Sequence, residues 1–477
     1  MKLDKKNLKD IEKNSLFKEI GSIADKLKIE AYIVGGYPRD LLLNNQNKQD
    51  IDFVVSDKVN DLSQILSKKL NTKVTIFKNF GTTHMMHENI ELNFVEARKE
   101  SYKDNSRNPD IKKATIKEDI DRRDFTINAI SISLNKDNFG EILDIYNGQN
   151  DIKNKIIKTP LDPDKTFSDD PLRMLRAIRF ANQLNFQIEA KTIASVKSNK
   201  NRIQIISQER ITTEFNKILM CKNPSTGLNL LDQTGLLNII FPELILLKGI
   251  DTKNNISHKD NFIHTLKVVD NINDIVNENN KNLLWLKWAA LLHDIAKPKT
   301  KKFIENIGWT FYGHDVIGSR MIKKIFQKFK LPLNEKMKYV EKLVLLHLRP
   351  IALAKVEITD SAIRRLLFDA QDILEDLLIL CTADITSKNE QKIKKYKQNY
   401  ELVKKKLKEV EEKDKIRNWK PPINGNNIMK LLKLPQSKEI GYILNEIKEA
   451  ILDGKIKNNK KEALELMYQK YEELKKS

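Results

Sequence analysis

Two aspartates, Asp50 and Asp52, introduce a short apolar run in this 477-residue chain. If the run is a β-strand, side chains two positions apart point to one face, so the two carboxylates lie together. Paired carboxylate oxygens on a rigid strand are ligands suited to Mg²⁺. Two such ions can activate an attacking hydroxyl and neutralise a departing pyrophosphate, and Glu91 on a later strand-like run could support them. The spacing therefore predicts metal-assisted phosphoryl chemistry.

A glycine pair precedes these aspartates. Gly35 and Gly36 follow the apolar run 31–34 and lead into a predicted helix. Glycine lets the backbone approach phosphates, the first turn of a helix offers free N–H groups, and Arg39 adds a guanidinium fork. A bare Asp-X-Asp is most often a solvated pair on an edge strand, and strand–glycine–helix turns are common. The two patterns together, beside apolar residues 53–55, favour a phosphate and metal site.

A second group of residues could select a nucleotide base. Asp170 and Arg173 are three residues apart on a predicted helix, and Arg176 and Arg179 continue at the same step. Cytosine and adenine both present an amino donor beside a ring-nitrogen acceptor, whereas guanine and uracil present the reverse order. One carboxylate beside one guanidinium can therefore pair with C and A and reject G and U. The alternative is an intrahelical ion pair with a solvated arginine row.

A third group consists of histidines and aspartates between residues 258 and 390. An adjacent His-Asp pair at the end of an apolar helix, with a distant histidine and aspartate, forms a mixed nitrogen and oxygen ligand set suited to a transition metal. The four residues are His264, His293, Asp294 and Asp384. His314 and His347 lie between them in the sequence and could join the set.

The elements that position these groups change type along the chain. Apolar periodicity predicts strands at 31–34, 51–55, 74–77, 90–95 and 129–134, with helices at 8–28 and 61–70. Beyond Pro163 nearly everything is predicted as amphipathic helix, including a buried helix at 283–295 and a charged one at 404–415. We expect an α+β head with a small mixed sheet and helices (1–160), then an all-α neck (161–250), body (251–390) and tail (391–477).

The charge and cysteine content of the chain indicate which partner and which cellular compartment to expect. Lys and Arg number 85 against 65 Asp and Glu, which gives a net charge of +20. This excess suits a polyanionic partner such as nucleic acid, although a lysine-rich proteome would give the same balance. Two cysteines form no CxxC pair, and no apolar stretch approaches the length of a membrane span. We expect a soluble cytoplasmic protein and leave its oligomeric state open.

Three segments carry a family resemblance. Residues 35–55, with GGYPRD and DIDFVV, resemble motif A of the class II tRNA nucleotidyltransferases and bacterial poly(A) polymerases of the polymerase β superfamily. Residues 119–129 resemble their motif B, and residues 168–173 resemble their motif D, except that Asp169 stands where the family usually has Glu. The resemblance implies a nucleotidyltransferase head with two Mg²⁺ ions.

The resemblance also implies a role for each matched residue. Asp50 and Asp52 would bind the metal ions and act as the catalytic carboxylates. The other matched residues would bind CTP or ATP through its phosphates or its base; they are Gly36, Arg39, Arg123, Asp170, Arg173, Arg176 and Arg179.

The later part of the chain resembles two further families. Residues 258–390 are similar to the HD phosphohydrolases, which implies a metal such as Ni²⁺ or Mn²⁺ at the histidine–aspartate group and hydrolysis of phosphoesters at RNA ends, for example 2′,3′-cyclic phosphates. An HD fold without metal is the alternative. Residues 421–464 resemble the tail of HD-containing tRNA nucleotidyltransferases, which implies that this segment binds the tRNA elbow. The alternative is that the segment only packs against the rest of the protein.

The leading functional interpretation is addition of C, C and A to the 3′ end of tRNA from CTP and ATP, without a nucleic-acid template and with release of pyrophosphate. A poly(A) polymerase is an alternative, but residues 78–84 lack the basic stretch usual in those enzymes. An enzyme adding only CC or only A is another, although 97–117, with Arg98, Tyr102, Arg107 and Pro109, resembles the loop needed for A addition. An HD hydrolase with an inert head conflicts with the intact Asp50 and Asp52.

Overall fold

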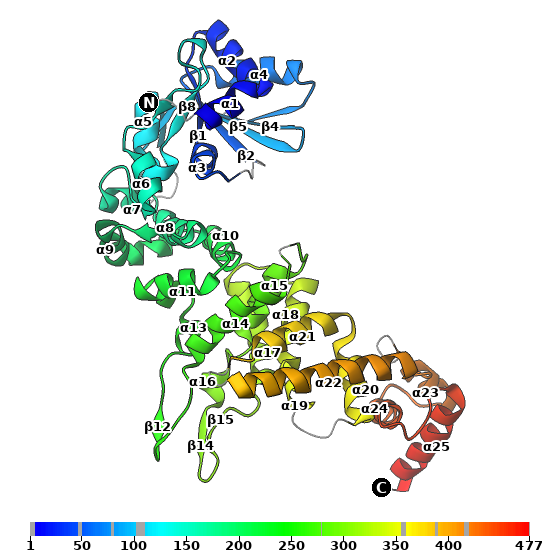
Figure 1. Ribbon diagram of the computed structural model, residues 1–477. Coiled ribbons are helices and arrows are strands. Elements are labelled where there is room, and N and C mark those ends of the chain that lie inside the picture. Colours follow the sequence, from blue (N-terminus) through cyan, green and yellow to red (C-terminus); the bar gives the residue numbers. More distant parts are fainter. Residues whose placement is uncertain are drawn as a thin grey trace. The chain divides into compact units, whose positions relative to one another are not determined.

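The computed structural model describes residues 5–45, 50–77, 81–101, 110–277, 279–353, 359–386, 390–414 and 419–476. The chain divides into two compact units, Met1–Ile245 and Leu246–Ser477 (Figure 1), and each contains buried apolar side chains. Several residues weighed above lie outside the described part, namely 78–80 and Tyr102, Arg107 and Pro109. No helix among the described residues has the length and apolarity that a membrane crossing requires.

The first unit is built on a seven-stranded sheet of order β3-β4-β5-β2-β1-β8-β9 (Figure 1). Its strands are β1 (Ala31–Val34), β2 (Asp50–Val55), β3 (Val74–Phe77), β4 (Thr82–His87), β5 (Ile90–Glu96), β8 (Ser131–Ser133) and β9 (Ile142–Leu143). Strands β2 and β5 pair in parallel, whereas every other pairing in this sheet is antiparallel. The expected small mixed sheet is confirmed.

The core of the head fixes which way strand β2 faces. Ile51, Phe53 and Val55 are buried in the main apolar cluster, together with residues of α2 (Ser15–Leu27) and α4 (Val59–Lys69). The Phe53 ring stacks on Phe94 of the parallel neighbour, with ring centroids 4.6 Å apart. Because successive strand residues alternate between faces, burial of this set directs the two aspartates to the opposite face.

The helix expected at 8–28 is two helices. Helix α1 spans Lys5–Lys13 and α2 begins at Ser15, because the Asn14 side chain accepts hydrogen bonds from the N–H groups of Leu16 and Phe17 and caps α2. The next helix, α3 (Gly36–Leu42), starts directly after β1 and Gly35.

The remaining elements of the first unit lie between the sheet and residue 245. They are β6 (Arg98–Ser101), β7 (Asp110–Lys113), α5 (Ile116–Asp121), η2 (Thr126–Asn128), η3 (Lys136–Asn138), α6 (Gly148–Asn154), β10 (Ile156–Ile157), α7 (Pro163–Asp169), α8 (Leu172–Leu184), β11 (Gln187–Ile188), α9 (Ala190–Asn199), η4 (Lys200–Ile205), α10 (Gln208–Leu219), α11 (Pro224–Gln233), α12 (Leu236–Ile240) and α13 (Pro242–Ile245). Helix α8 packs against α7, α10 and α11, and residues from its middle, such as Met174 and Ile178, are fully buried.

The second unit is helical, as expected, apart from two short hairpins. Its helices are α14 (Asn261–Ile275), α15 (Leu283–Leu292), α16 (Lys297–Thr300), α17 (His314–Lys328), α18 (Glu335–Leu346), α19 (Leu348–Leu353), α20 (Asp360–Ala370), η5 (Gln371–Ile373), α21 (Leu374–Ala383), α22 (Glu390–Asp414), α23 (Gly425–Leu432), α24 (Lys438–Leu452) and α25 (Lys460–Lys476). The predicted buried helix corresponds to α15, and the predicted charged helix is the end of α22.

The two hairpins of the second unit were not expected from the sequence. They are β12 (Thr252–Lys253) with β13 (Ile256–Ser257), and β14 (Lys302–Ile304) with β15 (Gly308–Thr310). The first turn is possible because Asn254 and Asn255 both adopt positive φ, which asparagine tolerates. The hairpins lie side by side (Figure 1), and the Trp309 indole donates to the Ile256 carbonyl at 3.0 Å.

Candidate active site

The glycine turn lies directly beside the predicted metal ligands. Strand pairing sets Val34 opposite Asp52, so the turn that follows β1 reaches the Asp52 carboxylate. Gly35 has φ of +74°, and a Cβ there would lie 3.3 Å from Asp52 Oδ2 and 3.7 Å from Arg123 Nη1. A side chain at position 35 would therefore crowd the Asp52 carboxylate, and the positive φ also favours glycine at this position. The structure brings together Gly35, Asp52 and Arg123, with Gly36 next in the chain as the first residue of α3.

The two aspartates repel each other in this arrangement. Burial raises the pKa of Asp52, and the neighbouring Asp50 charge raises it further, against the opposing effect of Arg123. Burial and the charge of Glu91 likewise raise the pKa of Asp50. Glu91 lies opposite Asp50 in the parallel pairing of β2 with β5. A set of clustered oxygen ligands with excess negative charge fits a hard divalent cation, which would relieve this repulsion.

Arg39 is buried and bound to protein. Its Nε and Nη2 donate to Asp40 at 2.8 and 3.0 Å, and its Nη1 donates to Asn128 Oδ1 at 2.8 Å. Its guanidinium also lies over the Phe180 ring, 5.1 Å from the centroid. These contacts fix the position of the Arg39 side chain. The contact of Arg39 with a triphosphate stays a prediction.

Asp119 is a buried residue that the sequence interpretation did not include in the site. It binds the two arginines that follow α5, with Arg122 Nε at 3.0 Å from Oδ1 and Arg123 Nη2 at 3.0 Å from Oδ2. Burial acts to raise the pKa of Asp119, but Arg123 and Arg122 outweigh it and leave the pKa lowered. Asp119 stands four residues before Arg123, and this helical spacing is the signal that could have identified the pair.

The structure corrects the placement of Asp170. This residue is not on a helix with Arg173; it has extended backbone at the end of α7, and α8 begins at Leu172. The Asp170 carboxylate accepts from the Leu172 N–H at 3.1 Å and from Arg210 Nη2 at 2.8 Å. Nothing in the local sequence signals Arg210, which lies forty positions later on α10.

Arg173 binds backbone rather than Asp170. Its Nη2 donates to the Arg122 carbonyl at 2.6 Å, and its Nη1 donates to the Thr166 carbonyl at 3.4 Å. Because two carbonyls orient its guanidinium, Arg173 presents a defined edge next to Asp170 without forming an ion pair with it. The predicted pairing of these two residues with a base stays a prediction.

Arg176 and Arg179 are paired with buried carboxylates, so the alternative of a solvated arginine row is wrong. Arg176 Nη2 lies 2.6 Å from Asp124 Oδ2, and Arg179 Nε lies 2.8 Å from Glu214 Oε2. The pKa of Asp124 is lowered to about 2, because Arg176 above all outweighs the effect of burial. Sequence reasoning missed Asp124 and Glu214 as the partners of these two arginines.

The second unit brings together all six residues of the predicted histidine–aspartate group. His264 Nε2 lies 2.8 Å from Asp384 Oδ1, and His293 Nε2 lies 3.3 Å from Asp294 Oδ2. On the other side, the second oxygen of Asp294 lies 3.3 Å from His314 Nε2. Two triads therefore share Asp294, one with His264 and His293 and the other with His314 and His347.

The orientation of the imidazoles suits metal binding. Nδ1 of His293, His314 and His347 each donates to a backbone carbonyl, at 2.7, 2.7 and 2.6 Å. These bonds favour the ring proton on Nδ1 and direct each Nε2 toward the centre, where the Nε2 atoms of His314 and His347 lie 3.3 Å apart. Among the described residues, the buried His293 Nε2 forms no hydrogen bond, whereas Asp294 Oδ2 forms an ion pair with Lys297 Nζ at 2.6 Å. The donor set thus fits a transition metal.

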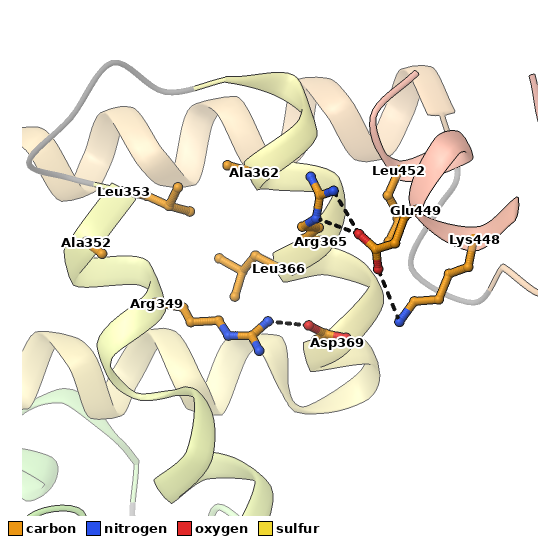
Figure 2. Close-up of a pocket in the computed structure, with 10 residues that line it drawn as sticks. All are labelled: Arg349, Ala352, Leu353, Ala362, Arg365, Leu366, Asp369, Lys448, Glu449 and Leu452. Atoms are coloured by element: carbon orange, nitrogen blue, oxygen red, sulfur yellow. Dashed lines mark hydrogen bonds and ion pairs between the residues drawn. The ribbon is translucent and has the colours of Figure 1, made fainter. Parts of the chain in front are cut away.

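A separate hollow of about 630 Å³ lies among α19, α20 and α24 (Figure 2). Its charged residues pair across it: Arg365 bonds to Glu449 at 2.8 Å, and Arg349 forms an ion pair with Asp369. Alanines and leucines line the rest. The Arg365–Glu449 bond connects α20 to α24. None of the predicted site residues lines this hollow.

Profiles of known protein families match three successive parts of the chain. Three family profiles match: "Poly A polymerase head domain" over residues 31–158, "Probable RNA and SrmB- binding site of polymerase A" over 185–247, and "HD domain" over 261–389. The arrangement is also similar to a solved "CCA-adding enzyme with CTP", with a TM-score of 0.64, 21% identity and 98% of both chains covered. At that identity the likeness shows the fold.

The sequence relatives are matched over different shares of their length. An A-adding tRNA nucleotidyltransferase from Aquifex aeolicus is 40% identical over 36% of this chain, but over only 21% of its own length. Several curated CCA-adding enzymes are matched over about half of their length. A multifunctional CCA protein from Mannheimia succiniciproducens is 32% identical over 64% of this chain and 71% of the relative. Since this relative is matched over more than two thirds of its length and the three profiles cover the head, the following RNA-binding region and the HD region in turn, the chain belongs to the class II tRNA nucleotidyltransferases that carry an HD domain.

Proposed function

We propose that this chain adds C, C and A to the 3′ end of tRNA from CTP and ATP and releases pyrophosphate. The observation that carries the proposal is the meeting of Gly35, Asp52 and Arg123, with Asp50 on the same face of β2. It sets a backbone turn able to approach phosphates next to oxygen ligands for Mg²⁺. Family membership supports it, since relatives are named A-adding and CCA-adding enzymes.

The head would carry the chemical step. Asp50 and Asp52 would hold two Mg²⁺ ions, which lower the cost of charge on the attacking 3′ oxygen and the departing pyrophosphate. Gly36, Arg39 and Arg123 would orient the triphosphate. Burial keeps water from competing with these groups for the phosphate oxygens.

The neck would select the base. Asp170 and Arg173 would pair with the common Watson–Crick edge of C and A, while Arg176 and Arg179 would hold base or phosphates. Arg210 and the Leu172 N–H would orient the Asp170 carboxylate, because each binds one of its two oxygens, and the remaining lone pairs would accept from the nucleotide. Rejection of G and U would follow from leaving these polar groups unpaired.

The proposed domains are a catalytic head (1–160), a neck that binds the nucleotide base and RNA (161–250), an HD body (251–390) and a tail (391–477). The tail would contact the tRNA elbow through shape and phosphate rather than sequence, which suits the net charge of +20.

The test uses the full chain with tRNAs truncated at each 3′ position and one nucleotide at a time. Stepwise addition of C, C and A supports the proposal, and Asp52→Asn should abolish it, whereas the surface control Asp57→Asn should not. Long A tracts from ATP alone would identify a poly(A) polymerase instead. Addition of only CC or only A would identify a partial enzyme.

A second candidate activity is supported by the histidine–aspartate group. We propose that His264, His293, Asp294 and Asp384 hold a transition metal such as Ni²⁺ or Mn²⁺, that His314 and His347 extend the site, and that it hydrolyses phosphoesters at RNA ends. The supporting observation is that the Nε2 atoms converge on Asp294 while Nδ1 atoms are held by carbonyls.

This activity is tested in an Asp52→Asn background, which removes nucleotidyl transfer. The chain loaded with Ni²⁺ or Mn²⁺ should contain bound metal and open RNA 2′,3′-cyclic phosphate ends. Absence of bound metal and of hydrolysis with either ion would overturn the assignment and leave the HD fold as a structural module.

A further inference from the structure

Three neighbouring strands place a histidine and an asparagine on the face that carries the aspartates. Strand β2 pairs with β5 so that Asp52 lies opposite Asn93, and β5 pairs with β4 so that Asn93 lies opposite His84. Because residues opposite one another in neighbouring strands project to the same face, the three side chains form a row across the sheet. Sequence reasoning did not identify His84 or Asn93 as site residues.

The hydrogen bonds along this row have one possible direction. His84 Nδ1 lies 3.0 Å from Asn93 Oδ1 and 3.3 Å from Glu91 Oε1. Both partners are oxygens that only accept, so Nδ1 carries the proton and donates. The Asn93 carbonyl oxygen therefore faces His84, and its amino group faces the aspartates.

The Asn93 amino group is bound to the metal-binding pair. Its Nδ2 donates to Asp50 Oδ1 at 2.8 Å, and Asn93 lies opposite Asp52 in the pairing of β2 with β5, where it lowers the pKa of that carboxyl. One amide thus lies beside two carboxylates that repel each other. The hydrogen bond to Asp50 restricts the rotation of that carboxylate and leaves its remaining lone pairs directed to a cation shared with Asp52.

We infer that Asn93 is a positioning residue for the Asp50–Asp52 metal site and that His84 sets its orientation. The inference rests on the proposed function, because it assigns a role toward the Mg²⁺ of the same site. Its consequence is that loss of the Asn93 amide weakens cation binding without altering the contacts made to the nucleotide by Arg123 or Asp170.

The experiment measures Mn²⁺ binding to the nucleotide-free full chain by electron paramagnetic resonance. Every sample carries Asp294→Asn, so that the HD group does not contribute, and Asp50→Asn defines the signal of the head site. Asn93→Ala should weaken binding about tenfold, as expected for loss of one hydrogen bond to a charged group. His84→Ala should weaken it less, His84→Gln should restore it, and Met86→Leu on the same face of β4 is the matched control.

Two further measurements separate positioning from general damage. His84→Ala should add nothing in the Asn93→Ala background, since it acts only through the amide. In transfer assays the Mg²⁺ requirement should rise while the KM for CTP stays constant. Unchanged Mn²⁺ affinity in Asn93→Ala, or full additivity of the two changes, would overturn the inference alone. Absence of any Asp50-dependent Mn²⁺ site would overturn the proposed function with it.

Discussion

Arg176 and Asp124 form a buried ion pair, with Nη2 2.6 Å from Oδ2, that joins helix α8 to the segment before η2. The same carboxylate accepts from the Asn128 amide at 3.0 Å through its other oxygen. Asn128 in turn binds Arg39. The neck and the glycine turn are therefore connected through one carboxylate and one amide.

Asp124→Asn is expected to destabilise the first unit by about 2–3 kcal/mol. The change keeps an oxygen for Asn128 but leaves the Arg176 charge without its closest partner in a largely buried site. Urea unfolding of the full chain, followed by a probe in the first unit, measures the loss. Asp137→Asn, at an exposed position, should have almost no effect; equal losses in both variants would contradict the assignment.

The same ion pair makes the free energy of unfolding depend on pH. The folded pKa of Asp124 is about 2, below the value of about 3.9 in an unfolded chain, so its contribution to stability is complete above about pH 5 and is lost as pH falls toward 2. Unfolding free energy measured between pH 5 and 2.5 should fall less steeply in Asp124→Asn than in the parent chain. Parallel pH profiles would show that the pair is not formed.

Gly35→Ala is expected to abolish most nucleotidyl transfer. Its φ of +74° disfavours any side chain, and the new Cβ would lie 3.3 Å from Asp52 Oδ2. The stability cost should be about 1 kcal/mol or more, while the transfer rate falls further because Asp52 is displaced. Gly441→Ala is the matched control, since a Cβ there meets nothing within 4 Å and alanine favours helix α24.

Arg173→Ala is expected to reduce base selectivity more than metal binding. Loss of the guanidinium removes one donor from the proposed template and leaves Asp170 held by Arg210. Primer extension with each of the four nucleotides should show U or G incorporated at C and A positions, with Mn²⁺ affinity of the head unchanged. Full C and A addition with no misincorporation would refute the template.

Asp294→Asn is expected to remove metal from the HD group. Asp294 is the carboxylate shared by both triads, and its two oxygens face different histidines. Metal analysis of the purified chain should show loss of the tightly bound ion, and the melting temperature of the second unit should no longer respond to a chelator. Asp274→Asn, at an exposed position of α14, should retain both properties.

Much of the head could be predicted from local sequence. Strand periodicity correctly set Asp50 and Asp52 on one face, because alternation along a strand is a property of the backbone and the buried face of β2 is continuous. The motifs also indicated the nucleotidyltransferase and HD families, since their spacing reflects short loops between adjacent elements. The two hairpins were missed because each strand has only two or three residues.

Tertiary structure alone decided which charges meet. Asp170 pairs with Arg210, and Arg179 pairs with Glu214, across sequence separations at which no helical or strand period constrains the contact. The sequence suggested that Asp170 and Arg173 share a helix face, but the chain turns at Pro171 before α8 begins. The row from His84 through Asn93 to Asp50 likewise depends on the register of three strands. A sequence determines the period within each element, whereas packing against the core determines which elements become neighbours and in what register.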